Sequence, residues 1–578
     1  MKRLVVGLLA VGAWGCGPAT PGTDAGVDAG PEICVQLLPE RFPASTTLPK
    51  GCYLAQKTPV ISAAVTLTLS PGVKIVFSPD VGLHFSAEQA LVAQGTEAEP
   101  IMFTALVPTR GSWAGLSFDG TTVPSRIDWA VVEYGGNTTH DRDAAAIKMT
   151  ADSRGVRLGL THVTVRESMG WGLYAGGSAV FPQFEANVLT RNTLGPASLD
   201  EEVVGVIDPA SRFAGNDRDE LVVFGSRVSH SATWQTLDVP YFMADSVYLA
   251  VADLTLLPGA IFHMDTDTGF RISGDTGALI AVGTATQPIL FTGTATRGSW
   301  SGFAFDGSNN TRNVIDHATV EWAGNITHDS DAAAIKLTAD SHGVQLRLSN
   351  VTVRESQGWG LYATGSAVLP QFTGNVLTHN GLGPVSIDSN NAHMLLPASS
   401  YAGNDLDRVN VRAQWVKEAV TWQLLDVPYR LDGNLQPDKV LTLAPGVTME
   451  LTDQSSIRVS GTDDVSGFYA VGTAALPITI TGVTKTAGAW DGIVFDGDNN
   501  GANVLDHCII EYGGGGTRFG WKGMIFSASD SHGVTVSVTN STVRHSATWG
   551  IWFNRGQTGS VSGNTYASNA QGDYYKEP

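Results

Sequence analysis

One long phrase occurs three times in this chain, and its spacing limits the fold more than any other feature. The phrase combines a Trp between two glycines with an Asp-Gly turn, and it occupies residues 111–136, 298–324 and 488–514. The spacing from Trp113 to Trp300 is about 187 residues, and the spacing from Trp300 to Trp490 is slightly longer. A unit of this length is far longer than a single helical repeat, so each unit must contain smaller structural repeats of its own.

Short β-strand patterns fill each unit. In 315–322, Ala318, Val320 and Trp322 alternate with His317 and Glu321, which predicts an apolar inward face and a polar outward face. In 341–356 the alternation breaks at a two-residue polar corner and resumes at once, whereas a hairpin would reverse and build a matched partner strand. Because helical periodicity is nearly absent, the pattern predicts an all-β parallel solenoid, in which each strand stacks on its equivalent one coil away.

The repeat also predicts how the chain is divided. Coils of about 20–25 residues would give about eight coils in each unit and roughly twenty in all. We expect a signal peptide at 1–15, an acylated cysteine with a flexible tether at 16–33, and an N-terminal cap at 34–60. Three β-helix units should follow at 61–230, 231–418 and 419–578, and the polar tail 562–578 should form an irregular C-terminal cap.

The N-terminus predicts export. Lys2 and Arg3 precede an apolar run at 4–13 that is too short to span a bilayer, and Cys16 follows shortly after it. This order is similar to a bacterial lipobox, in which the cysteine is acylated, although Trp14 is bulkier than the residue usual there. We therefore expect a lipoprotein of the outer membrane or cell surface, held in the membrane by its lipid. The alternative is an ordinary signal peptide and a secreted product.

Composition agrees with an exported, folded rod. The chain is 43% hydrophobic and 16% charged, which excludes a disordered chain, and its net charge of −20 disfavours binding to nucleic acid. Cys34 and Cys52 flank a segment with few apolar contacts behind the tether, and we expect a disulfide between them that closes the N-terminal end. Cys508 takes the place of Ala130 and Ala318, which predicts a small interior residue.

Several phrases together resemble a known family. The segments 240–262 and 278–294, followed by GSWSGFAF and VIDHATVEWAG, look like the right-handed parallel β-helix proteins of bacterial envelopes, many of which are lipoproteins. The resemblance covers nearly all of the chain after the tether. It implies a right-handed parallel β-helix and a surface or envelope protein, and it implies no common catalytic set.

Pectate-lyase-like enzymes share this fold, and one set of residues is a candidate for their chemistry. A lyase of that kind needs acidic side chains that hold Ca²⁺ and a Lys or Arg that takes a proton. The second unit offers Asp306, Asp316, Lys336 and Arg354. However, Asp128 and Asp506 occupy the equivalent places in the other two units. An Asp that recurs in every copy is better explained by a corner that every copy needs than by an active site, which is needed once.

Two Gly- and Asn-bordered loops are candidates for metal binding. His140, Asp141 and Asp143 in the first unit match His328, Asp329 and Asp331 in the second. Oxygen-rich loops of this type can hold Ca²⁺, and a His would suit a transition metal; no other cofactor is expected. The alternative is a solvated loop whose Asp residues turn the chain. The third unit carries TRFGWKGMIF here and keeps no such ligand.

Tryptophans recur beside glycine and are candidates for sugar binding. Trp171, Trp359 and Trp549 lie at matching places, and a Trp beside Gly can form a flat platform on which a sugar ring stacks. For Trp113, Trp300 and Trp490 the flanking residues favour packing inside the coil instead.

These features together predict a lipid-anchored, monomeric, non-enzymatic envelope protein whose lateral face binds glycans or a surface protein. No serine-nucleophile elbow, P-loop, paired CxxC or dinucleotide fingerprint occurs in the chain. The alternative is a polysaccharide-degrading enzyme, a lyase or a glycoside hydrolase, on the same scaffold.

Overall fold

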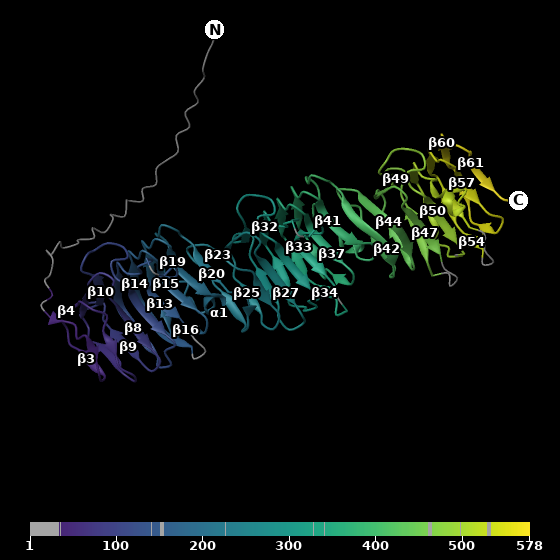
Figure 1. The fold of residues 1–578 in the computed structure, drawn as a ribbon. Helices are drawn as coiled ribbons and strands as arrows, with labels where there is room; N and C mark the ends of the chain where they lie inside the picture. The colour runs from purple at the N-terminus through teal and green to yellow at the C-terminus, as the bar shows by residue number, and fades with distance from the viewer. Residues whose placement is uncertain are drawn as a thin grey trace, which may run out of the picture.

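The computed structural model describes Cys34 and residues 36–139, 141–150, 155–225, 227–327, 329–339, 341–460, 465–497, 499–528 and 533–578. Nearly every element in these ranges is a short β-strand, and the strands pair in parallel. The helices in this described part are α1 (Glu201–Val204) and the 3-10 turns η1 (Ala392–Met394) and η2 (Gly516–Phe519). The strands lie across the long axis of an elongated rod (Figure 1), which confirms the predicted all-β parallel β-helix.

One circuit of the chain can be followed in the second unit. β25 (Leu254–Leu256), β26 (Ile261–Met264) and β27 (Gly269–Ser273) lie in three different sheets. Each pairs in parallel with the strand one circuit later, namely β28 (Leu279–Val282), β29 (Ile289–Thr292) and β30 (Gly302–Asp306). The cross-section therefore has three sides, and each side is a sheet that runs along the rod.

The longest sheets contain strands from more than one unit. One has twelve strands, in the spatial order β8 (Gly82–Ser86), β11 (Gly115–Asp119), β13 (Ala145–Thr150), β15 (Trp171–Gly176), β19 (Gly195–Asp200), β20 (Leu221–Phe224), β23 (Tyr241–Met243), β26, β29, β32 (Ala318–Glu321), β36 (Thr352–Arg354) and β40 (Val376–Thr378). A second contains β21 (Arg227–Val228), β24 (Val247–Leu249), β27, β30, β33 (Ala333–Thr338), β37 (Trp359–Thr364), β41 (Gly383–Asp388), β42 (Val409–Val416) and β44 (Tyr429–Pro437). The β-helix is therefore continuous from unit to unit.

β44 turns a corner and leads into two sides of the third unit. Its first half pairs with β46 (Thr448–Leu451), followed by β49 (Ile478–Gly482), β52 (Cys508–Glu511), β56 (Thr542–Arg544) and β60 (Thr565–Ala567). Its second half pairs with β47 (Ser456–Ser460), followed by β50 (Gly492–Asp496), β53 (Gly523–Ser527), β57 (Trp549–Phe553) and β61 (Gly572–Lys576). The tail 562–578, expected to be an irregular cap, thus carries β60 and β61 of one more coil.

The third side of the second unit has six strands: β22 (Ala232–Trp234), β25, β28, β31 (Val314–Asp316), β35 (Arg347–Ser349) and β39 (Phe372–Thr373). Leu254 pairs with Leu279, whereas Ile280 pairs with Val314, which lies considerably further along the chain. Inserted loops therefore lengthen some coils beyond the predicted coil length. Fewer coils than the predicted eight fit into this unit for that reason.

Equivalent strands of successive units lie on different sides of the rod. β11 and β30 carry the same phrase, yet the sheet of β11 continues into the second unit with β29, and β30 lies on the next side. The shift recurs in the third unit, because the sheet of β30 continues with β49 while the equivalent strand β50 lies on the next side. Outer faces that correspond in sequence are therefore rotated by one side from unit to unit.

Apolar side chains fill the interior as predicted. Trp113, Trp300 and Trp490 are fully buried, and each indole N–H donates to a backbone carbonyl at 2.8–2.9 Å. Their packing role is confirmed. Cys508 is also buried, and this burial raises the pKa of its thiol to about 12.

Two predictions for 315–322 are wrong. Trp322 is only partly buried because its φ of 65° places it at a left-handed corner, which breaks the two-residue alternation and takes the ring out of the core. Glu321, predicted to face solvent, is 9% exposed. Its carboxylate accepts hydrogen bonds from Thr292 and Arg354 on the two neighbouring coils, both at 2.8 Å. Glu133 and Glu511 are held in the same way, so this acidic residue connects three coils in each unit.

Buried asparagines pair the backbone at another corner. Asn380 is fully buried, and its Oδ1 accepts the N–H of Ser356 at 3.1 Å. Its Nδ2 donates to the carbonyl of Val353 at 3.2 Å and to Asn404 at 3.0 Å. Asn192 and Asn569 accept and donate in the same pattern. Because each unpaired buried backbone group costs about 1–3 kcal/mol, these side chains hold successive coils in register.

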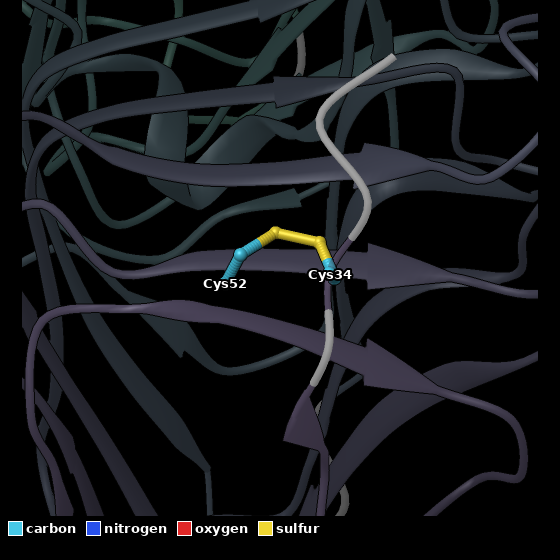
Figure 2. Close-up of a disulfide and its surroundings, with 2 residues drawn as sticks. All are labelled: Cys34 and Cys52. Carbon is cyan, nitrogen blue, oxygen red and sulfur yellow. A yellow bond between two sulfur atoms is a disulfide. The ribbon is translucent and has the colours of Figure 1, made fainter.

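A disulfide joins Cys34 and Cys52 at the N-terminal end, with the two Cα atoms 4.9 Å apart (Figure 2). Cys52 begins β4 (Cys52–Ala55), which pairs with β1 (Gln36–Leu37) on one side. The bond therefore fixes the start of the first coil to the strand that stacks on it. Cys16 and the other residues of 1–33 lie outside the described residues.

Replacing Asn380 by Ala should lower the free energy of unfolding by about 2–4 kcal/mol, because Ser356 N–H and Val353 C=O would both be left buried and unpaired. Urea unfolding followed by circular dichroism would measure the loss. Asn309→Ala, at an exposed position of the same unit, is the control and should change the value by less than about 0.5 kcal/mol. Equal effects of the two changes would contradict the structural role of the buried asparagine.

Glu201 should make stability fall as pH rises from about 4.5 to about 7. Burial, together with the charges of Asp200 and Glu202, raises its pKa to about 7, so the folded chain keeps a proton that the unfolded chain has lost. The protonated carboxyl of Glu201 contributes its full stabilisation below pH 4.5, and this contribution is lost as the pH rises through about 7. Glu201→Gln should thus be more stable than the wild type by about 1–2 kcal/mol at pH 8 and show no such gain at pH 4.5. The same difference at both pH values would refute this explanation.

Candidate functional site

One line of outward-facing side chains differs strongly between the units, and we call it the outer column. Its members are direct neighbours on successive parallel strands, about 4.8 Å apart. The column contains His84, Ser117, Lys148 and Tyr174 in the first unit, Arg271, Ala304, Lys336 and Tyr362 in the second, and Arg458, Val494, Phe526 and Trp552 in the third. The first two units thus present charged and polar groups where the third presents apolar and aromatic ones.

In the second unit the outer column lines a polar cleft of about 410 Å³. Asn325 donates to Asp267 across this cleft at 2.6 Å, and Asp329 forms an ion pair with Lys336. The Lys336 ammonium also lies 5.1 Å from the ring centre of Tyr362. The first unit repeats these contacts with Asn137 and Asp80, with Asp141 and Lys148, and with Tyr174. The paired contacts hold the loop after β32 against the outer face of the sheet.

The candidate metal loop is held by hydrogen bonds within the protein. Asp329 accepts the backbone N–H of Asp331 at 3.0 Å, and Asp331 accepts the hydroxyl of Tyr362 at 3.2 Å. Burial alone would raise the pKa of Asp329, but Lys336 and the N–H of Asp331 lower it below its ordinary value.

The first-unit loop has the same internal bond, from the N–H of Asp143 to Asp141 at 2.9 Å. His140 and His328 lie outside the described residues. Among the side chains that the structure does describe, no group of three or more His, Cys, Asp or Glu could hold a metal ion. The described contacts support the interpretation of a loop whose aspartates turn the chain.

The four lyase candidates do not come together. Asp306 and Lys336 line one cleft of about 360 Å³ on the outer face of β30 and β33. Asp316 lies at the end of β31 on another side of the rod, where it accepts hydrogen bonds from Ser349 at 2.9 Å and Asn350 at 3.0 Å. Arg354 lies on β36 on the third side and pairs with Glu321. Asp316 and Arg354 thus connect coils.

The third unit forms an aromatic cleft on its outer column. The cleft has a volume of about 550 Å³, and its lining includes Asn434, Gln436, Ser456, Arg458, Asp496, Phe519, Trp521 and Phe526. Phe526 stacks on Trp552 with ring centres 5.3 Å apart, and these two rings and Val494 form a small apolar cluster outside the main core. This cluster gives one end of the cleft a packed apolar surface.

η2 and the residues after it form a second wall of this cleft. The Phe519 ring is 58% exposed and lies 5.3 Å from the ring of Trp521. Trp521 packs so closely on Gly516 that a side-chain carbon there would lie 2.3 Å from the indole. Arg518 lies over Phe519 at 4.6 Å and pairs with the buried Asp491 at 2.6 Å. The wall is therefore an aromatic edge fixed by packing and by an ion pair.

The three predicted platform tryptophans begin β15, β37 and β57 and are partly buried. Trp171, Trp359 and Trp549 each cover a glycine of the next coil, where an added side-chain carbon would lie 2.3–3.0 Å from the ring. Trp549 also contacts Tyr575, with ring centres 5.3 Å apart, and packs against the third-unit apolar cluster. Of the three, Trp549 adjoins the aromatic cleft.

Arg458, Asp496, Phe519 and Trp521 were not predicted as parts of a site. The sequence does carry a signal for them, because three changes coincide in the third unit. TRFGWKGMIF replaces the Asp-containing loop, Phe526 replaces Lys336, and Trp552 replaces Tyr362. A concerted change from charged to aromatic residues indicates that one outer face has acquired different chemistry.

Comparison with known proteins identified no relative from which a function could be transferred. No protein-family model matches the chain, and no curated protein matches it. In the described ranges, no helix has both the length and the apolar character needed to cross a membrane.

Proposed function

We propose that the protein is a lipid-anchored rod of the bacterial envelope that binds a glycan in the aromatic cleft of its third unit. The observation that carries the proposal is the meeting of Phe519 and Trp521 with Gln436, Arg458 and Asp496 in one cleft. A sugar ring presents C–H groups that stack on an aromatic ring and hydroxyls that donate and accept hydrogen bonds. Fixed aromatic walls with a few convergent polar groups are typical of sites for such ligands.

The N-terminal region supports display outside the cytoplasm. The Cys34–Cys52 disulfide at the start of the rod is a bond typical of oxidising compartments. Cys16 would carry the lipid, and the Gly-, Pro- and Asp-rich segment after it would separate the rod from the membrane. The lipid anchor and the envelope location are therefore part of the same proposal.

A polysaccharide-degrading enzyme is the second candidate, and one observation favours it. Asp306 and Lys336 share a cleft with Arg271 and Asp329 in the second unit. Against it, Asp329 is engaged by Lys336, and Asp306 accepts the hydroxyl of Thr338 at 3.0 Å. Binding without turnover in the third unit is the stronger proposal, because there the aromatic and polar groups converge.

Trp521→Ala should weaken glycan binding about tenfold, because it removes a stacking surface from the wall of the cleft. The chain without 1–15 is applied to a glycan array, and affinity for the retained glycan is then measured by titration calorimetry. Tyr248→Ala is the matched control, because Tyr248 is a 42% exposed aromatic residue of the second unit. It should bind as the wild type does.

Two results would count against glycan binding in this cleft: retention of no glycan by the wild type, or equal losses in Trp521→Ala and Tyr248→Ala. The same samples are assayed for release of unsaturated sugars with and without Ca²⁺. Turnover that Asp306→Asn abolishes would instead favour the enzyme.

Cys16→Ala should abolish incorporation of palmitate and release the chain from the membrane fraction. The physical reason is that two or more acyl chains provide stable anchoring, whereas the charged rod has little affinity for a bilayer of its own. Metabolic labelling with palmitate, followed by membrane fractionation, measures both effects. Labelling that persists in the Cys16→Ala variant would show that the anchor is not at this residue.

A further inference from the structure

We infer that the aromatic cleft selects glycans with two free hydroxyl groups on adjacent ring carbons, and that the ion pair of Arg458 and Asp496 binds these two hydroxyls. The inference rests on the proposed function and adds the chemical class of the sugar. It follows from three observations: the free hydrogen-bonding atoms of this ion pair, the loss of a threonine that engages the same carboxylate in the other units, and the aromatic wall of the same cleft.

The ion pair keeps hydrogen-bonding atoms for a ligand. Arg458 and Asp496 both line the cleft, and Nη2 of Arg458 donates to Oδ2 of Asp496 at 2.6 Å. Among the described residues neither side chain makes another hydrogen bond, so the second carboxylate oxygen and two of the guanidinium nitrogens have no partner there. The two side chains are 27% and 45% exposed, which leaves these atoms within reach of a molecule in the cleft.

The same carboxylate occurs in every unit, but a threonine engages it in the first two. Asp306 accepts the hydroxyl of Thr338, its neighbour on the next strand, at 3.0 Å. The first unit repeats this bond at 3.3 Å. In the third unit Phe495 pairs with Ser527, so the neighbour of Asp496 is Ala528, which has no hydroxyl to donate. The carboxylate of Asp496 is therefore free to pair with an arginine and to accept from a ligand.

The second unit serves as an internal contrast, because it has the arginine as well. Arg271 occupies the place of Arg458, yet it forms no ion pair with any described carboxylate and lies 6.0 Å from the ring centre of Tyr248. The arginine and the aspartate are thus present in both units and are joined in the third, where the threonine is missing. The ion pair is therefore one more feature of the third unit that changes together with the aromatic loop.

Two adjacent hydroxyl groups of a sugar match this pair. Each hydroxyl can donate one hydrogen bond and accept others. One hydroxyl can donate to the carboxylate of Asp496 while its neighbour accepts from the guanidinium of Arg458, and hydrogen bonds to charged groups are the stronger ones. Because the two charged groups are in contact, a ring whose free hydroxyls are not adjacent can bond only one of them.

The aromatic wall of the same cleft would hold the ring of the sugar. Phe519 and Trp521 line the cleft together with the ion pair, and their ring centres lie 5.3 Å apart. Gln436 also lines the cleft, and it is the neighbour of Arg458 because Leu435 on β44 pairs with Ile457 on β47. Its amide can donate or accept one further hydrogen bond. The C–H groups of a sugar would thus lie on the aromatic rings, and its hydroxyls would reach the polar side chains.

The test compares long glucan, mannan and galactan chains that differ in linkage. In a chain linked through positions 1 and 4, each internal ring keeps adjacent free hydroxyls at positions 2 and 3. In a chain linked through positions 1 and 3, the free hydroxyls of an internal ring are not adjacent. Both kinds are placed on the array beside glycans of other linkages. The chain without 1–15 should bind glycans with adjacent hydroxyls about tenfold more tightly than their counterparts without them.

Asp496→Asn and Arg458→Gln should each weaken binding of the retained glycans about tenfold and reduce the preference for adjacent hydroxyls, because each removes one of the two charged partners. Trp521→Ala should weaken binding of both kinds of chain and keep the preference, because it removes only the stacking surface. Arg347→Gln, at an exposed position of the second unit, is the matched control and should change neither affinity nor preference. Thermal unfolding verifies that all variants fold.

Two results would overturn selection by the ion pair and leave glycan binding in the cleft intact. One is equal affinity of the wild type for glycans with and without adjacent free hydroxyls. The other is an undiminished preference in both Asp496→Asn and Arg458→Gln. Retention of no glycan by the wild type would overturn the proposed function itself.

Discussion

Parallel stacking of coil on coil is the constraint on which the rest of this molecule depends. A strand in such a rod has no partner within its own coil, so its backbone groups are paired by the coils before and after it. Side chains add to this pairing. At a corner, Asn380 holds the N–H of Ser356 and the carbonyl of Val353. Within the sheet, the carboxylate of Glu321 connects the side chains of Thr292 and Arg354 on the two neighbouring coils. These positions are set by neighbouring coils, which explains why each unit repeats them.

Outward-facing side chains are not needed to pair one coil with the next, and several of them differ together between the units. Lys336 is stabilised by Asp329 on the adjoining loop and lies against Tyr362 on the next strand. In the third unit all three are replaced together, and Phe526 instead stacks on Trp552 under an aromatic loop. A lysine without its aspartate, or a phenylalanine without its stacking partner, would be the less stable intermediate. The same scaffold therefore carries either a charged cleft or an aromatic one.

The features predicted correctly from the sequence are those that depend on alternation within a strand or on a repeated phrase. Alternation and the long, regular repeat suffice for the parallel β-helix, and the Gly-Ser-Trp-Ser-Gly phrase suffices for the burial of Trp300. The predictions fail where contacts between coils override the alternation, as at Glu321 and Trp322. The aromatic cleft was missed for the same reason. Arg458 is a neighbour of Gln436 only through strand register, and coil lengths vary too much for that register to be read from spacing.

Because the equivalent faces of successive units are rotated by one side, the outer columns of the three units do not line up along the rod. If the units were stacked without rotation, their outer columns would merge into one groove along the whole rod. Because the sheet of β11 continues with β29 and that of β30 continues with β49, each outer column instead faces its own direction. The cleft of the second unit therefore cannot extend the aromatic cleft of the third. The first coils and the third unit lie at opposite ends of the rod (Figure 1), so the length of the rod separates the aromatic cleft from the end at which we propose the anchor.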